Sequence, residues 1–281
     1  MPKPWGKHET KAVLVLANGT VIEGQGAGAT GTAVAEVCFN TAITGYQEIL
    51  TDPSYAGQIV TFTFPHIGNV GANDEDLETL NQSATDKVIG AIFREPITNP
   101  SNYRSASHFN DWLTARGIIG LCGIDTRALT AHIRENGLAN AVICHNPDGA
   151  FDLSALKAQA AAWSGLEGQD LVPGVTSDET NAWDQTPWTW NEGFATVGSG
   201  TFHVVAYDFG VKRNILRLLA GLDCKVTVVP ATTSAEDVLA LEPNGIFLSN
   251  GPGDPAATGE YAVEQIRILV ESGLPVFGIC L

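Results

Sequence analysis

The chain has 281 residues, 44% of them hydrophobic and 16% charged, a balance typical of a globular protein with one large or two ordinary domains. Its formal net charge of −16 argues against a nucleic-acid partner, because such proteins need clustered lysine and arginine side chains. No apolar run approaches the length of a membrane span and the first residues lack a signal-peptide core, so we expect a cytoplasmic protein without a membrane partner.

The first part of the sequence is predicted to be rich in β-strands. Apolar runs at 13–16 and 20–22 flank Asn18 and Gly19, and this pair predicts a two-residue hairpin turn because both residues tolerate a positive φ. Further strands are expected at 34–39, 58–64 and 88–93.

Residues 26–31 match the G-x-G-x-x-G fingerprint of dinucleotide-binding proteins, and Asp52 lies at a plausible distance downstream. That fingerprint requires a helix directly after the glycines, whereas residues 32–39 alternate like a strand and Asp52 lies in a turn. We therefore reject a dinucleotide site. The chain also has no G-x-x-x-x-G-K-[ST] loop, so we expect no nucleotide chemistry in it.

A dense polar stretch covers residues 44–48 and 51–55. Asp52 and Pro53 predict a turn, and the hydroxyl group of Ser54 can cap it. On this pattern alone, Ser54 is a structural residue.

A helix is predicted to begin at Asp125. Leu129 and Ile133 then fall on one helix face, and Asn136-Gly137 is a typical stop signal. A short strand near 139–144 and an alanine-rich helix over 152–163 follow.

Residues 173–200 differ in composition from the rest of the chain. They are rich in Pro, Gly, Ser and Thr, with little periodicity, and residues 197–200 are typical of a flexible connection. We place the domain boundary here, with a first domain at 1–172 and a second at 201–281. The segment also holds Trp183, Trp188 and Trp190, which either form a binding surface or, as we favour, pack the segment onto a domain.

Strands and helices are predicted to alternate in the second domain. This alternation implies a parallel, doubly wound sheet of about four strands, with ligands bound at the carboxyl ends of the strands. A stripe of apolar residues is expected to turn the first helix toward the sheet, namely Val211, Ile215, Leu218, Leu219 and Leu222. The expected elements are a strand at 202–207, that first helix, a strand at 225–229, a helix opened by Ser234, a strand at 245–249, a helix at 259–272 and a strand at 275–279.

Two features fall at the carboxyl ends of these strands. The last strand runs directly into Cys280, and G-x-C after a buried strand is how a nucleophile elbow begins. Residues 251–255, Gly-Pro-Gly-Asp-Pro, either form a tight connection or present backbone N–H groups to an oxyanion. The pair together favours a covalent catalyst whose nucleophile is Cys280.

The remaining cysteines and the histidines suggest no second site. The chain has five cysteines without C-x-x-C spacing, which favours buried free thiols at Cys38, Cys122, Cys144 and Cys224 over disulfides or a zinc site. None of the six histidines is an obvious catalytic partner. His203 begins a strand at the end of the sheet opposite the predicted site and is interpreted as structural.

The chain carries eight specific motifs: FNT (39–41), TGYQEILTDPSY (44–55), PHIGN (65–69), IDTR (124–127), HVVAYDFG (203–210), KRNILR (212–217), LSNGPGDP (248–255) and PVFGICL (275–281). With these motifs it resembles, over nearly its whole length, the small, glutamine-hydrolysing subunits of carbamoyl-phosphate synthetases. The last two motifs alone are typical of any class I glutamine amidotransferase, whereas the N-terminal ones single out this family and disfavour anthranilate or GMP synthase components.

The resemblance implies a fold and a set of site residues. The fold is α/β, with a β-rich N-terminal α/β domain followed by part of a doubly wound, mainly parallel amidotransferase sheet. Cys280 would attack the side-chain amide of L-glutamine and release ammonia. Gly253 and Leu281 would supply the oxyanion-hole N–H groups, Gly251 would line the glutamine pocket, and Ser54 would hold the glutamine backbone. No metal site is implied in this chain.

The resemblance also implies partners. Ammonia would pass to a large subunit that binds ATP, a divalent metal and bicarbonate and makes carbamoyl phosphate for arginine and pyrimidine synthesis. The heterodimers could associate further, and this chain itself would need no cofactor.

The sequence departs from the family pattern after Cys280. The family's further glutamine contacts, catalytic histidine and glutamate lie downstream, and none is present here. We therefore expect this chain alone to lack normal glutaminase turnover and to aggregate through an uncovered last strand. The alternative interpretation is an incompetent fragment that acts at most as a large-subunit-binding module.

Overall fold

The computed structural model describes residues 9–81, 87–196 and 199–280, and the chain divides into two compact units. Of the described residues, those up to Leu50 belong to the first unit, together with 57–76 and 88–165. The second unit contains the described residues from Leu166 onward, and it also includes Thr51–Ala56 and the described part of the segment that starts at Leu77. The turn that carries Ser54 thus belongs to the second unit.

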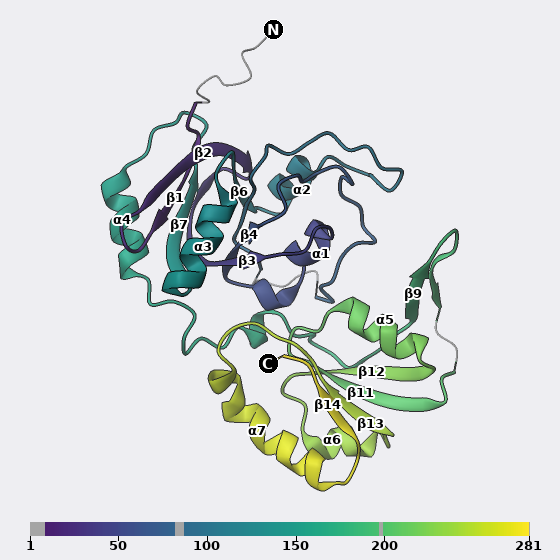
Figure 1. The fold of residues 1–281 in the computed structure, drawn as a ribbon. Coiled ribbons are helices and arrows are strands. Elements are labelled where there is room, and N and C mark those ends of the chain that lie inside the picture. The colour runs from purple at the N-terminus through teal and green to yellow at the C-terminus, as the bar shows by residue number, and fades with distance from the viewer. Residues whose placement is uncertain (1–8, 82–86, 197–198, 281) are drawn as a thin grey trace. The chain divides into compact units, whose positions relative to one another are not determined.

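A closed β-barrel forms the first unit, with strand order β1-β2-β6-β5-β4-β3-β7 (Figure 1). The predicted hairpin is confirmed, because β1 and β2 pair antiparallel, but its turn is not the expected two-residue one. The Leu16 N–H donates to the Thr20 carbonyl, so residues 17–19 form the turn, and of the predicted pair only Gly19 has a positive φ, at +86°. The strands are β1 (Ala12–Leu16), β2 (Val21–Gly28), β3 (Gly31–Asn40), β4 (Gln58–Phe62), β5 (Gly90–Ile92), β6 (Ile119–Cys122) and β7 (Ala139–His145).

Residues 26–31 lie at the end of β2 and in the turn to β3. The strand β3 follows the glycines, as predicted, in place of the helix that the dinucleotide fingerprint requires.

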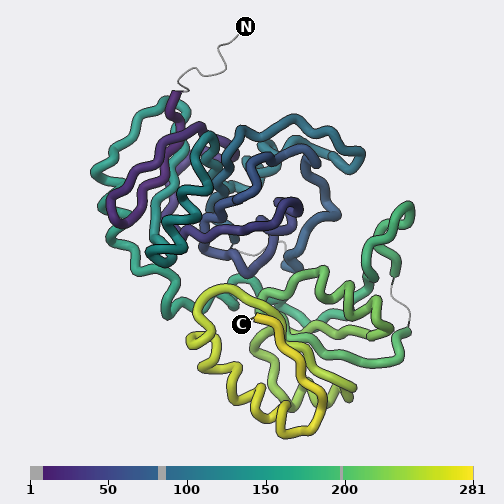
Figure 2. Tube along the Cα trace, in the orientation of Figure 1, coloured from purple at the N-terminus to yellow at the C-terminus, as the bar shows by residue number. Residues whose placement is uncertain are grey.

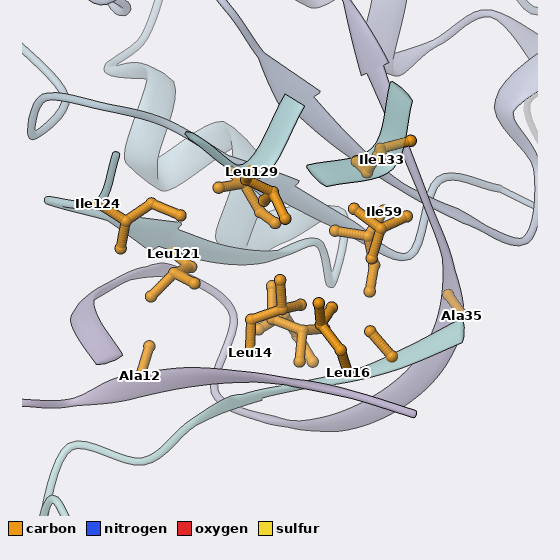
Figure 3. Close-up of a cluster of buried hydrophobic side chains, with 14 residues drawn as sticks. Ala12, Leu14, Leu16, Ala35, Ile59, Leu121, Ile124, Leu129 and Ile133 are labelled. Carbon is orange, nitrogen blue, oxygen red and sulfur yellow. The ribbon is translucent and has the colours of Figure 1, made fainter. Parts of the chain in front are cut away.

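Aliphatic side chains fill the barrel, and α3 packs against them (Figure 3). The predicted start, face and end of α3 are confirmed. Asp125 accepts a hydrogen bond from the Ala128 N–H at 3.0 Å, Leu129 and Ile133 are buried, and Gly137 has a φ of +85°. The helices of this unit are α1 (Tyr46–Leu50), α2 (Phe109–Ala115), α3 (Thr126–Asn136) and α4 (Leu153–Ala162).

The second unit is built on a five-stranded sheet of order β14-β13-β11-β12-β8 (Figure 1). The four strands β11 (Phe202–Asp208), β12 (Cys224–Pro230), β13 (Gly245–Leu248) and β14 (Val276–Gly278) are parallel. In Figure 2 the yellow C-terminal strand runs alongside the others. The expectation of about four strands is corrected by β8 (Asn181–Ala182), which comes from the segment 173–200 and pairs antiparallel with β12.

Helices cover both faces of this sheet, as a doubly wound fold requires. Val205, Tyr207 and Val229 point to the face covered by α6 (Ala235–Ala240) and α7 (Pro255–Glu271). Ala206 and Val228 point to the opposite face, where Leu216 of α5 (Arg213–Gly221) packs.

The predicted stripe on α5 is partly wrong. Leu216 and Ala220 are buried, whereas the side chains of Leu218 and Leu222 are 53% and 72% exposed. A second neighbour explains the rotation, because α5 also packs against the hairpin formed by β9 (Gln185–Thr189) and β10 (Gly193–Thr196). The Arg217 guanidinium donates to Gln185 Oε1 at 3.2 Å and lies 3.7 Å from the ring centre of Phe194.

The segment 173–200 packs onto the second unit through one of its tryptophans. Trp183 packs in the cluster beneath α5 and donates from Nε1 to the Gln185 carbonyl at 2.6 Å, whereas Trp190 is exposed. Residues 197–198, which belong to the stretch expected to be flexible, lie outside the described residues.

The long helix α7 begins at Pro255 and not at 259 as expected. Asp254 is its N-cap and accepts from the Ala256 N–H at 2.8 Å, with Pro255 in the first turn. Asp-Pro is a typical helix start, so this boundary was available from the sequence.

Candidate functional site

The ends of β13 and β14 bring the two predicted motifs to one edge of the second sheet. Leu248 pairs with Gly278, and the Ile279 N–H donates to the Leu248 carbonyl at 3.1 Å. Cys280 and Asn250 therefore leave neighbouring parallel strands at their carboxyl ends. This is the edge at which doubly wound sheets bind ligands.

Cys280 has the backbone conformation of a nucleophile elbow. Its φ is +74°, in the left-handed region that costs an L-residue roughly 1–2 kcal/mol, and its side chain is exposed. A thiol held outward on a strained turn after a strand is the arrangement that presents a nucleophile to a substrate.

The other four cysteines are buried free thiols, as predicted. Burial raises the pKa of the Cys38 thiol to about 12 and that of Cys122 to about 11, with smaller contributions from Glu36 and Glu95. Because the thiolate is the reactive form, burial and a raised pKa make these two thiols poor nucleophiles at neutral pH.

The glycine loop after β13 is built so that side chains would not fit. A Cβ on Gly251 would collide with the Phe209 carbonyl, and one on Gly253, whose φ is +82°, would lie 2.6 Å from the Gln169 carbonyl oxygen. Among the residues that the structure describes, neither glycine uses its backbone N–H in a hydrogen bond. Both N–H groups are thus available to a ligand, as an oxyanion hole needs.

Asp254 fixes the end of this loop. Its carboxylate accepts from the N–H groups of Gly168 and Ala256, each at 2.8 Å, and these bonds lower its pKa. Its own N–H donates to the Gln169 carbonyl at 2.9 Å. The end of the loop is thus held by two bonds to the Asp254 carboxylate and one backbone bond.

Ser54 reaches the same edge of the sheet. It lies in a 3₁₀ turn, Pro53–Tyr55. The sequence suggested that the Ser54 hydroxyl caps this turn, but the cap is the side chain of Asp52. The Asp52 carboxylate accepts from the Ser54 N–H at 2.9 Å, and the Asn250 side chain donates from Nδ2 to Ser54 Oγ at the same distance. The hydroxyl is therefore part of the strand-end network.

Two buried side chains hold the neighbouring strand end. Asp208, at the end of β11, accepts from the N–H groups of Gly210 and Val211 at 2.9 and 2.7 Å, while burial raises its pKa. Ser249 accepts from the Phe209 N–H at 2.9 Å. Sequence reasoning missed the roles of Asp208, Ser249 and Asn250, although Asp208 and Asn250 directly follow predicted strands and Ser249 is the last residue of one.

Some predicted residues take no part in this arrangement. Leu281 lies outside the described residues. The imidazole Nε2 of His203 lies 2.8 Å from Thr227 Oγ1, near the amino ends of β11 and β12. Over the described ranges, no cluster of His, Cys, Asp or Glu could hold a metal ion, and no helix combines the length and hydropathy of a membrane span.

Comparisons with known proteins agree with the two units. Residues 14–143 match the family description "Carbamoyl-phosphate synthase small chain, CPSase domain", and residues 205–281 match "Glutamine amidotransferase class-I". The chain is 68% identical over 279 residues to the carbamoyl phosphate synthase small chain of Rhizobium meliloti (strain 1021), covering 99% of this chain and 70% of the relative.

Two further relatives carry the same name. Identity is 67% over 280 residues with the protein of Agrobacterium fabrum, covering 99% and 70% of the two chains, and 66% over 281 residues with that of Mesorhizobium japonicum, covering 100% and 71%. These matches do not favour the alternative of a mere binding module. Among solved structures, an aminopeptidase from Aneurinibacillus sp. strain AM-1 aligns over 87% of this chain and 57% of its own length. The TM-score of 0.28 and the identity of 11% are too low to indicate a shared fold.

Proposed function

Because the chain belongs to the carbamoyl phosphate synthase small chain family, we propose that it is the subunit that hydrolyses glutamine for such a synthase. The single observation that carries the proposal is the exposed thiol of Cys280, held at a φ of +74° beside the glycine loop of the neighbouring strand.

The reaction proposed at Cys280 has two stages. The sulfur attacks the side-chain amide carbon of glutamine, and the C–N bond breaks to leave a glutamyl thioester. The departing nitrogen takes up the proton that the thiol gives up, so that ammonia leaves. Water then cleaves the thioester, which yields glutamate and restores the thiol.

The oxyanion formed in each stage would be stabilised by backbone donors. The unused N–H of Gly253 supports this role, with the N–H of Leu281 as its proposed partner. Gly251 would line the glutamine pocket, and its unused backbone N–H supports this role. Ser54 would hold the glutamine backbone through its hydroxyl group.

The proposed partner is the large subunit of the synthase. It would bind ATP, a divalent metal and bicarbonate and use the ammonia to make carbamoyl phosphate for arginine and pyrimidine synthesis in the cytoplasm. The small chain itself would hold no cofactor, and its heterodimers could associate further.

The test is glutamine turnover by the chain assembled with its large subunit. We expect glutamate and ammonia to form in equal amounts, and Cys280→Ser to abolish both while the complex still makes carbamoyl phosphate from free ammonia. Cys224→Ser is the matched control and is expected to keep full activity, because Cys224 is buried. Undiminished glutamine hydrolysis by Cys280→Ser would refute the proposal.

A further inference from the structure

The side-chain amide of Asn250 has only one orientation that satisfies its surroundings. The Gly210 carbonyl, which can only accept, lies 2.8 Å from one end of the amide, and the Lys212 N–H, which can only donate, lies 3.3 Å from the other. Nδ2 must therefore face Gly210 and Oδ1 must face Lys212. Asn250 is 3% exposed, so water does not compete for these bonds.

This orientation decides the role of the Ser54 hydroxyl. The second hydrogen of Nδ2 points at Ser54 Oγ, 2.9 Å away, so the serine oxygen accepts in this bond. A hydroxyl that accepts through a lone pair still has its own hydrogen to donate, and accepting a bond strengthens that donation. The Ser54 N–H is engaged by Asp52, which keeps the backbone of the turn in place.

We propose that Asn250 is a positioning residue that orients the Ser54 hydroxyl and leaves its hydrogen to be donated to bound glutamine. The inference rests on the proposed function, in which Ser54 holds the glutamine backbone, and adds to it the residue that fixes the serine. Asn250 acts through Ser54 and need not touch the substrate.

A purely structural role for Asn250 predicts something different. Its amide also ties the turn at Gly210 to the end of β13, so Asn250→Ala would weaken the loop in either case. If Asn250→Ala acts through a loop defect, it weakens glutamine binding whether or not residue 54 carries a hydroxyl group. If Asn250→Ala acts through Ser54, it weakens binding only while the Ser54 hydroxyl is present.

A double-mutant cycle separates the two roles. Glutamine KM and kcat are measured for the complex with Asn250→Ala, Ser54→Ala and both changes. We expect Ser54→Ala to raise KM about tenfold or more and Asn250→Ala to raise it about fivefold, since a hydrogen bond to glutamine is lost or misaligned. kcat should change less than KM. In the Ser54→Ala background, Asn250→Ala should change KM by less than about twofold.

Ser249→Ala is the matched control, because Ser249 is buried in the same strand end and its hydroxyl accepts from the Phe209 N–H and donates to the Asn250 carbonyl rather than to Ser54. Its effect on KM should be equal in both backgrounds. Equal effects of Asn250→Ala in both backgrounds would overturn the inference. Asn250→Asp provides a second variant, which keeps the acceptor for the Lys212 N–H. Its carboxylate would accept the Ser54 hydrogen, so KM should rise further than in Asn250→Ala. A wild-type KM in Asn250→Asp would also overturn the inference.

The proposed function fails separately from this inference. If the wild-type complex does not hydrolyse glutamine, or Cys280→Ser retains hydrolysis, the function is wrong. If hydrolysis depends on Cys280 but the cycle is additive, only the positioning role of Asn250 is wrong.

Discussion

The ammonium group of Lys212 lies 3.2 Å from the carboxylate of Asp52, and this ion pair joins the start of α5 to the turn that carries Ser54. The Lys212 side chain is 38% exposed and that of Asp52 only 10%. Burial lowers the pKa of Lys212, but the charges of Asp52 and Glu78 outweigh it, and the pKa is raised. Lys212 is therefore charged at neutral pH, and its ion pair with Asp52 fixes the turn that carries Ser54.

Lys212→Met should loosen this anchor. A partly exposed ion pair is worth about 1 kcal/mol, and here Asp52 would also be left without its cation in a nearly buried position. We expect a fall of about 1–2 kcal/mol in the free energy of unfolding, measured by denaturant titration. The exposed Lys225→Met is the control, and an equal effect of both changes would show that the pair contributes nothing specific.

Glu78→Gln should stabilise the second unit as the pH rises. Glu78 accepts from the Asn214 N–H at 2.9 Å, and burial raises its pKa despite that bond and the charges of Arg217 and Lys212. Because the pKa of Glu78 is higher in the folded state than in the unfolded state, the protonated carboxyl favours the folded protein. This contribution to stability is complete below about pH 4 and is lost as the pH rises through the folded-state pKa.

Glutamine at position 78 keeps an acceptor for Asn214 without the cost of a buried charge. Thermal unfolding should therefore show equal stability of both proteins near pH 4 and a higher unfolding temperature for Glu78→Gln at pH 7. The exposed Glu264→Gln serves as the control. A less stable Glu78→Gln at pH 7 would mean that the attraction to Arg217 and Lys212 outweighs burial.

Gly253→Ala should damage both the loop and catalysis. The added Cβ would lie 2.6 Å from the Gln169 carbonyl oxygen and 3.0 Å from the Leu171 nitrogen, at a φ of +82°. We expect a loss of about 2 kcal/mol or more in stability and a fall in kcat of about a hundredfold as the proposed oxyanion donor moves. Gly245→Ala in β13, where the nearest atom would be 3.5 Å away, should have little effect on either.

The strands and helices of the second unit could be predicted from the sequence, but the hydrogen bonds that join Ser54 and Asn250 at the site could not. Alternating strands and helices placed Cys280 and the glycine loop at one edge, because parallel strands end together. Nothing in the pattern of residues 51–55 says that this turn joins the second unit, since the contact between Ser54 and Asn250 spans 196 residues. Only the resemblance to a family pointed to Ser54 as a ligand contact.

The α5 stripe failed for a related reason. Leu218 and Leu222 are as apolar as Leu216, so hydropathy alone could not choose among them. The β9–β10 hairpin sets the rotation of α5, because it contacts Arg217 through Gln185 and Phe194. Arg217 was not part of the predicted stripe. Local periodicity predicts that a helix has an apolar face, while its tertiary neighbours decide its rotation.

The backbone strain at Cys280 gives a stability prediction of its own. At an ordinary helix position, a protein with alanine is more stable than one with glycine by about 1 kcal/mol. The exposed residue Val263 in α7 is the control position, and Val263→Ala should be more stable than Val263→Gly by this amount. At a φ of +74° this order should reverse, with Cys280→Gly more stable than Cys280→Ala by up to about 1 kcal/mol. Thermal unfolding of the four variants provides the comparison. The same order at both positions would contradict a strained elbow.

The most direct test of the account is where a glutamine-like electrophile reacts. The protein is treated with a diazoketone analogue of glutamine at neutral pH, with and without excess L-glutamine, and the labelled peptides are mapped by mass spectrometry. We predict one label per chain, on Cys280, that glutamine suppresses and that Cys280→Ser abolishes. Labelling at Cys38, Cys122, Cys144 or Cys224 in its place, or labelling of Cys280 that glutamine leaves unchanged, would contradict the assignment of this thiol as the glutamine-cleaving nucleophile.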